Sequence, residues 1–307
     1  DLNGIEAKTG LPLRGEPAVR ILDLCGLVAN KNTIPGDEET ALGMGIRLGT
    51  PWISQRGMGK AEMEKLAELI ARGGRGERPD DLPGDILWET IDIARQKDVA
   101  ALTDRVVAEF GELHVLVNNA AVSEGGSLVD IPEENLRRQF EVNLFGPTLL
   151  TKGFARQMVE KRSGRIVFVS SVSGLMADPL MGPYCGTKHA TEAFADALSK
   201  ELQEFNVEVA TINPGPYLTG FNDREFETWK NWQSDADDTV FDYEKAAFPY
   251  EQFDPKEVTE PAIKVILGET NQYRNVIPEK MIPQVKERME NMWNKTTNEG
   301  LGERNET

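Results

Sequence analysis

Three short apolar runs, separated by long stretches of helical pattern, constrain the fold of this chain more than any other feature. They cover residues 113–117 (LHVLV), 165–169 (RIVFV) and 207–212 (VEVATI). Apolar runs of this length that alternate with helical patterns are typical of buried parallel strands in an α/β sheet. The stretches 133–161 and 184–205 are long enough for the crossover helices that parallel strands need. The sequence therefore predicts a doubly wound, mostly parallel sheet with helices on both faces.

Each apolar run is followed by a polar signature. The first opens into Asn-Asn-Ala-Ala at 118–121, the second into Ser170-Ser171, and the third into Asn-Pro-Gly-Pro-Tyr-Leu-Thr at 213–219. Ligands of parallel α/β sheets bind beyond the carboxyl ends of the strands. We therefore expect these three segments to border one binding site.

Tyr184 and Lys188 are the strongest candidates for chemistry. Positions i and i+4 lie on one face of a helix, so the ammonium can lie beside the phenol. A cation at that range favours the phenolate and lowers the pKa of the tyrosine. Tyr184 is thus predicted to be a general acid/base, with Ser171 holding a substrate oxygen. The pair alone is weak evidence, since a chain with five tyrosines contains Tyr-x-x-x-Lys by chance roughly one time in four.

In their order and spacing, these motifs resemble the short-chain dehydrogenase/reductase family from about residue 88 to 280. The matching pieces are Asn-Asn-Ala-Ala at 118–121, Asn143 in Phe-Glu-Val-Asn, Ser171, Tyr184-x-x-x-Lys188, and Pro214-Gly215-x-x-x-Thr219. The resemblance implies a Rossmann-like fold and an NAD- or NADP-dependent oxidoreductase that interconverts an alcohol and a carbonyl by hydride transfer.

The resemblance also implies residue roles. Tyr184 would exchange the proton, Lys188 would lower its pKa and hold the nicotinamide ribose, Ser171 would position the oxygen, and Asn143 would hold a water. The residues implied at the cofactor are Asn119, Asp92, Pro214, Gly215 and Thr219.

Structural roles remain open for several of these residues. Ser171 could simply cap the next turn, and Asn143 could satisfy backbone groups at a helix irregularity. Asn118 fits a residue that ties the strand better than a ligand, and Asp92 could be an ordinary loop carboxylate.

The glycine-rich turn that normally opens the family is incomplete here. The nearest candidate is residues 52–59 (WISQRGMG), in which Gly57 and Gly59 could be the later two glycines of the turn. Ile53 would replace the first glycine, and its Cβ disfavours close approach of a phosphate. One hypothesis is that a strand at 46–53, this turn and a helix from 60 to 72 replace the missing first unit.

Residues 1–72 are similar to the carboxyl-terminal part of serine hydroxymethyltransferases. The similarity rests on VANKNTIP at 28–35, GIRLGTP at 45–51 and RGMG at 56–59. In that family the arginine matching Arg47 binds a substrate carboxylate, whereas here a surface arginine is the simpler reading. The resemblance places the pyridoxal-phosphate lysine in the large domain, which this sequence does not contain, so a pyridoxal-phosphate enzyme is not expected.

The predicted organisation is therefore composite. Residues 1–75 form a transferase-like segment, 76–87 a junction rich in Gly, Pro and charge, 88–294 the dehydrogenase-like domain, and 295–307 a flexible tail.

The composition limits the kinds of partner that this chain is expected to bind. A net charge of −17 argues against nucleic acid and anionic membrane surfaces, and no apolar stretch is long enough to span a bilayer. The two cysteines, Cys25 and Cys185, are far apart and expected to be free, which favours a cytoplasmic protein. His114 and His189 are the two histidines, and neither lies in a metal-binding spacing, so no metal site is expected.

The C-terminal third is expected to choose the substrate. Phe221, Phe226, Trp229 and Trp232 have near-helical spacing, which suggests a lid helix over an apolar or aromatic carbonyl compound, or else packing onto the domain. A final amphipathic helix is predicted at 281–293. By analogy with the family, the long helices carrying Asn143 and Tyr184 would form a homodimer or homotetramer.

Three other functional readings stay open. The chain could be a catalytically impaired composite that acts by interaction, or a remnant of one-carbon or amino-acid metabolism through its first 72 residues. Halohydrin-dehalogenase-like chemistry also uses Ser and Tyr, but those relatives carry arginine where this chain has Lys188.

Overall fold

A parallel β-sheet is the framework of the larger part of the chain. The computed structural model describes residues 29–32, 45–48, 91–233 and 239–301. The contacts divide the chain into two units, Asp1–Thr90 and Ile91–Thr307. In the first unit, β1 (Ala29–Asn32) and β2 (Gly45–Leu48) form an antiparallel pair. Residues 46–48 of the strand suggested for the missing first unit therefore pair with β1, in place of the parallel pairing that the hypothesis requires.

The sheet of the second unit has the strand order β3-β4-β5-β6, and every neighbouring pair is parallel. Its strands are β3 (Val115–Asn118), β4 (Gly164–Val169), β5 (Val207–Pro214) and β6 (Arg274–Ile277). The three predicted strands are confirmed, and β6 is a fourth that the sequence analysis did not identify. The carboxyl ends of β3, β4 and β5 lie at one edge of the sheet, as expected.

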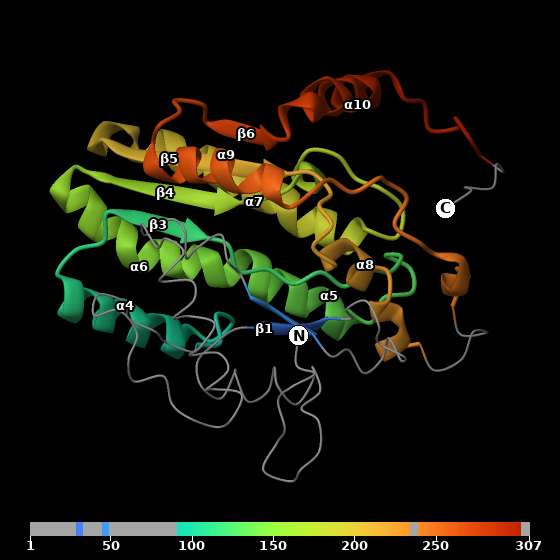
Figure 1. Ribbon diagram of the computed structural model, residues 1–307, viewed down its shortest axis with the longest axis horizontal. Coiled ribbons are helices and arrows are strands. Elements are labelled where there is room, and N and C mark those ends of the chain that lie inside the picture. Colours follow the sequence, from blue (N-terminus) through green and yellow to red (C-terminus); the bar gives the residue numbers. More distant parts are fainter. Residues whose placement is uncertain (1–28, 33–44, 49–90, 234–238, 302–307) are drawn as a thin grey trace, which may run out of the picture. The chain divides into compact units, whose positions relative to one another are not determined.

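Helices connect the strands (Figure 1). The α-helices are α4 (Gln96–Phe110), α5 (Glu133–Phe140), α6 (Gly146–Lys161), α7 (Gly182–Leu202), α8 (Phe221–Glu225), α9 (Lys256–Leu267) and α10 (Ile282–Asn294). Shorter turns are the π-helical η2 (Glu141–Phe145) and the 3-10 turns η3 (Val172–Gly174), η4 (Gln203–Phe205), η5 (Thr228–Asn231), η7 (Tyr243–Lys245) and η8 (Glu279–Met281). Both predicted crossover stretches are helical, and the first contains the π-helical turn.

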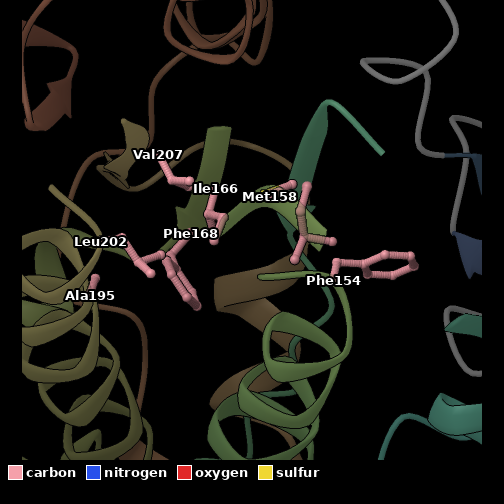
Figure 2. Close-up of a cluster of buried hydrophobic side chains, with 8 residues drawn as sticks. Phe154, Met158, Ile166, Phe168, Ala195, Leu202 and Val207 are labelled. Atoms are coloured by element: carbon pink, nitrogen blue, oxygen red, sulfur yellow. The ribbon is translucent and has the colours of Figure 1, made fainter. Parts of the chain in front are cut away.

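Alternate side chains of β4 enter different cores. Ile166 and Phe168 meet Phe154 and Met158 of α6, and Ala195 of α7 also lies in this core, as Figure 2 shows. Burial of a side chain such as Ile166 contributes roughly 1.5–3 kcal/mol. This period of two fixes the register of the strand, since a slip by one residue would exchange the two faces.

The opposite face of the sheet packs against α9. Val167 of β4 and Ile212 of β5 meet Val265 and Ile266 of α9 there. Helices therefore cover both faces, which confirms the predicted doubly wound, Rossmann-like α/β architecture.

The aromatic residues after Thr219 pack onto the domain, which is one of the two arrangements considered from the sequence. Residues 221–232 do not form one lid helix, because α8 ends at Glu225 and a separate 3-10 turn, η5, follows it. Phe226, Trp229 and Trp232 instead pack with Tyr243 on the body of the domain.

Candidate active site

Helix α7 brings Tyr184 and Lys188 to the end of β4. Pro183 in its first turn suits the start of a helix, because the missing N–H would have no partner there. Tyr184 is 7% exposed and Lys188 3% exposed. The Lys188 Nζ donates a hydrogen bond to the Val169 carbonyl at 2.8 Å and lies 5.6 Å from the centroid of the Tyr184 ring. The predicted phenol–ammonium pair is thus formed, with the ammonium facing the ring.

Ser171 follows β4 and begins the turn η3. Its Oγ accepts a hydrogen bond from the Ser173 N–H at 3.0 Å and so caps η3, and it donates to the Pro214 carbonyl at 3.5 Å. The Ser171 hydroxyl also lies near enough to the Tyr184 phenol to lower the pKa of that phenol. A substrate oxygen beside Tyr184 would therefore lie beside Ser171 as well.

The expected lowering of the Tyr184 pKa by Lys188 is wrong for this structure. Burial raises the pKa of Tyr184 well above its ordinary value, the negative charge of Glu225 raises it further, and the Ser171 hydrogen bond lowers it by less. Burial also lowers the pKa of Lys188 to about 8, with Glu192 acting in the opposite direction. Desolvation penalises the charged form of each group and is the largest cause of both pKa shifts.

A buried polar network lies beneath Lys188. Glu192, one turn along α7, accepts hydrogen bonds from Asn213 at 2.6 Å and from Arg274 at 3.0 Å. Asn213 Nδ2 also donates to the Ser171 carbonyl at 3.0 Å. The network therefore ties the Ser171 loop to α7, which carries Tyr184, and to β6.

Asn143 lies in the π-helical turn η2, as its structural reading predicted. Its side-chain amide donates to and accepts from the Val122 backbone, both at 2.8 Å, and donates to Thr187 Oγ1 at 3.0 Å. The amide is therefore engaged in joining the loop after β3 to α7. Pro147, four residues on, has no N–H, so the Asn143 carbonyl lacks its α-helical donor.

Three residues of the expected cofactor edge lie at the end of β5 or follow it. Pro214 ends β5, and the Gly215 N–H donates to the Ile277 carbonyl at 2.7 Å. A Cβ on Gly215 would clash with the Met281 sulfur, so this glycine packs closely against η8. Thr219 Oγ1 accepts from the Phe221 N–H at 3.4 Å, immediately before α8.

The remaining candidates are less constrained by contacts. Asn119 is exposed at the end of β3. Asn118 donates to Thr151 Oγ1 at 2.9 Å, which agrees with a role in tying the strand. Asp92 is paired locally with Arg95 at 3.2 Å and accepts from the Ala94 N–H. Gly57 and Gly59 lie outside the described residues.

The segment after Thr219 closes over Tyr184. Phe221, the first residue of α8, has its ring centroid 5.7 Å from that of Tyr184. Glu225, the last residue of α8, is 1% exposed. Burial raises the pKa of its carboxyl to about 8. An acid in this position was missed by the sequence analysis.

Sequence reasoning also missed the supporting residues Thr187, Glu192 and Asn213. Glu192 had a usable signal, since it follows Lys188 by four residues on one helix face. Thr187 and Asn213 had none, because their partners lie far away in the sequence. No cluster of three or more His, Cys, Asp or Glu side chains suited to a metal ion occurs in the described ranges.

Comparison with known families agrees with this geometry. The family model described as short chain dehydrogenase matches residues 62–230, more than half of the chain. The chain therefore belongs to the short-chain dehydrogenase family. The model for serine hydroxymethyltransferase matches residues 8–70, which confirms the second resemblance. The two matches overlap at residues 62–70, so the dehydrogenase match begins earlier than the motifs alone indicated.

Curated relatives include dehydrogenase/reductase SDR family member 7B of Mus musculus, which is 40% identical over 153 residues, 50% of this chain and 46% of that protein. The uncharacterized oxidoreductase YusZ of Bacillus subtilis (strain 168) is 32% identical over 198 residues, 64% of this chain and 68% of that protein. The chain thus spans about half the length of the mouse relative that it matches.

Among solved structures, a short chain dehydrogenase/reductase from Burkholderia phymatum in complex with NAD has the same fold, with a TM-score of 0.57. It is 24% identical and is covered over 77% of its length by 68% of this chain. In the part of the chain that the structure describes, no helix is both long enough and apolar enough to cross a bilayer.

Proposed function

We propose that this chain is an NAD- or NADP-dependent oxidoreductase that interconverts an alcohol and a carbonyl, with Tyr184 as the general acid/base. The observation that carries the proposal is the joint placement of Tyr184, Ser171 and Lys188 beyond the end of β4. Family membership and a relative of the same fold that holds NAD support the choice of cofactor.

The described residues fit the nicotinamide half of such a cofactor. Lys188 Nζ has three N–H donors and uses one on Val169, so two can meet vicinal ribose hydroxyls. Asn119 and Thr219 follow strands at the carboxyl edge of the sheet, where α/β folds bind ligands. When bound, the nicotinamide supplies or accepts the hydride.

The protein's own residues would handle the proton. In the reductive direction Tyr184 donates its phenolic proton to the carbonyl oxygen, while the Ser171 hydroxyl donates a hydrogen bond to the same oxygen. Lys188 would stabilise the phenolate that this transfer leaves behind. In the oxidative direction the phenolate accepts the proton of the alcohol. The raised pKa of Tyr184 keeps the phenol protonated and so suits the reductive direction.

Cofactor titration tests the proposal directly. NADH or NADPH at about 100 times its dissociation constant should stabilise the chain by about 2.7 kcal/mol, measured as a rise in melting temperature. Energy transfer from tryptophan to the reduced cofactor gives a second readout. Protection by neither cofactor would contradict the proposal and favour an impaired composite that acts by interaction. Absorbance of bound pyridoxal phosphate would instead favour the serine hydroxymethyltransferase remnant.

The same titration addresses the N-terminal segment. We keep the boundaries 1–75, 76–87, 88–294 and 295–307 as part of the proposal, supported by the division of contacts at Thr90 and Ile91. If Gly57 and Gly59 cradle the pyrophosphate, the variants Gly57→Leu and Gly59→Leu should lose affinity for the reduced cofactors. Unchanged affinity would refute that role. A cytoplasmic location likewise stays a prediction.

A homo-oligomer formed through α6 and α7 is a further part of the proposal. A largely apolar groove of about 670 Å³ runs between the two helices, with Ala155 and Val159 on one wall and Leu198 on the other. Phe194 stands exposed at this groove. An apolar face of this kind is typical of a surface that a second copy covers.

We expect Phe194→Glu to convert a dimer or tetramer into smaller species, because a charge would then be buried in the contact. Light scattering after size-exclusion chromatography measures the mass. Phe110→Glu is the matched control, since Phe110 is equally exposed but lies at the end of α4. A wild-type chain that is monomeric, or an unchanged mass for Phe194→Glu, would contradict the proposed interface.

A further inference from the structure

Glu225 is a buried acid in the candidate site, and its carboxylate has no hydrogen-bond partner among the described residues. Both of its carboxylate oxygens are closed to solvent. Native proteins rarely leave a buried polar group unpaired, because burial without a hydrogen bond is costly. The acid therefore calls for a ligand or another functional explanation.

The groups that face the Glu225 carboxyl identify where it points. Its charge raises the pKa of the Tyr184 phenol and of the Cys185 thiol, both on α7. The Ser123 hydroxyl also lies near enough to lower the pKa of Glu225, without forming a hydrogen bond of good geometry. No cation among the described residues contributes to the pKa of this carboxyl. The carboxyl thus lies near both the loop after β3 and the Tyr184 phenol.

The fold uses the backbone of Glu225 and leaves its carboxyl unused. The Glu225 carbonyl accepts hydrogen bonds from the Gly125 N–H at 3.1 Å and from Thr228 Oγ1 at 2.7 Å. A Cβ on Gly125 would lie 2.5 Å from that carbonyl oxygen, so the two segments are in close contact. These bonds would form with any side chain at position 225, and they do not explain why the side chain is an acid.

The rest of the surroundings are apolar. Phe221 lies against Tyr184, and Phe226 packs with Met181 and Trp229 next to Glu225. A ligand that enters here must displace the α8 segment from Tyr184. It gains apolar contacts along its body, and it can supply the missing partner of Glu225 only with a cation or a hydrogen-bond donor.

We propose that Glu225 is a specificity-determining residue that binds a protonated amine of the substrate, so that the chain acts on an amino alcohol or amino ketone with an apolar body. An ammonium satisfies a carboxylate by charge as well as by hydrogen bonds, and such charge-assisted bonds are roughly twice as strong as neutral ones. This inference rests on the proposed oxidoreductase function, since it places the amine next to the carbon that reacts.

A matched pair of probes tests the inference without turnover. Octylamine and octan-1-ol have the same alkyl body, and only the first carries an ammonium. We expect calorimetry of the full chain at pH 8.5, where the carboxyl is largely ionised and the amine protonated, to give at least tenfold tighter binding of octylamine.

Variants assign the preference to one side chain. Glu225→Gln and the apolar, similar-sized Glu225→Met should bind both probes equally, whereas Glu227→Gln should keep the preference, because Glu227 is exposed two residues away. Two different substitutions of Glu225 are used so that the test still holds if one of the variants fails to fold. Equal binding of both probes by the wild type, binding of neither, or a preference that survives both Glu225 variants would overturn the inference.

The cofactor titration separates this inference from the proposed function. Protection by NADH or NADPH together with no preference for octylamine would refute the amine site alone. A preference for octylamine without any protection by the cofactors would keep the amine site and refute the oxidoreductase function.

Discussion

Replacing Tyr184 by phenylalanine should lower kcat by about 10²–10⁴-fold, the usual contribution of a general acid/base. The variant keeps the ring that packs against Phe221 and loses the hydroxyl that exchanges the proton. Lys188 is held by the Val169 carbonyl and not by the phenol, so binding of NADH or NADPH should change by less than about twofold. Steady-state reduction of a carbonyl panel and a cofactor titration measure the two effects separately.

Tyr217→Phe is the matched control for this experiment. Tyr217 is also a buried tyrosine, but it packs against α9 on the opposite face of the sheet, and its hydroxyl has no hydrogen-bond partner among the described residues. Its removal should leave kcat nearly unchanged. A comparable loss in both variants, or Tyr184→Phe retaining most of its activity, would show that the phenol of Tyr184 is not the proton donor.

The sequence predicted the sheet well because its signals are local. The runs at 113–117, 165–169 and 207–212 are apolar enough to be read as buried strands, and β3, β4 and β5 are found there. The sequence analysis missed β6 because this strand has four residues, begins with Arg274 and Asn275, and contains no comparable apolar run. The spacing of the aromatic residues at 221–232 could not decide between a lid helix and packing onto the domain, because it does not reveal that α8 ends at Glu225.

The sequence predicted which residues come together in the candidate site better than it predicted the pKa shifts of those residues. Spacing on one helix correctly brought Lys188 next to Tyr184. It could not show that the ammonium would bond to Val169, nor that residues near Phe221, about 40 positions later, would bury the phenol. The sign of the pKa shift depends on those distant contacts, so the direction predicted for Tyr184 from helix spacing was wrong. The sequence analysis missed Glu225 for the same reason, since its burial also depends on contacts that are distant in the sequence.

Two family models match neighbouring parts of this chain, residues 8–70 and residues 62–230. The family normally places a phosphate-binding glycine turn before the first helix of the sheet, and here the corresponding stretch overlaps a serine hydroxymethyltransferase match. Ser171, Tyr184 and Lys188, by contrast, lie close together in the part of the chain that the structure describes. Cofactor affinity, rather than proton transfer, is therefore the property on which the enzymatic proposal depends most directly.

Replacing Glu225 by glutamine should remove a large pH dependence of stability. Burial raises the pKa of this carboxyl from 4.5 to about 8, so the folded chain holds a proton that the unfolded chain releases. Between these two values the unfolding free energy therefore falls as pH rises, and the loss is complete above pH 8. A shift of this size corresponds to about 3–5 kcal/mol, because each pKa unit contributes about 1.36 kcal/mol.

Glutamine has nearly the same shape and cannot ionise, so the variant should gain about 3–5 kcal/mol relative to the wild type between pH 5 and pH 8. Urea unfolding at several pH values measures this difference. The range ends at pH 8 because Lys188, whose pKa is lowered to about 8, adds stability as pH rises from there towards 10.5. Glu227→Gln, at an exposed site, is the matched control and should not reproduce this gain of about 3–5 kcal/mol. If the difference in unfolding free energy between Glu225→Gln and the wild type did not vary with pH, burial would not be what keeps the Glu225 carboxyl protonated. That result would contradict the description of Glu225 as a buried acid without a partner.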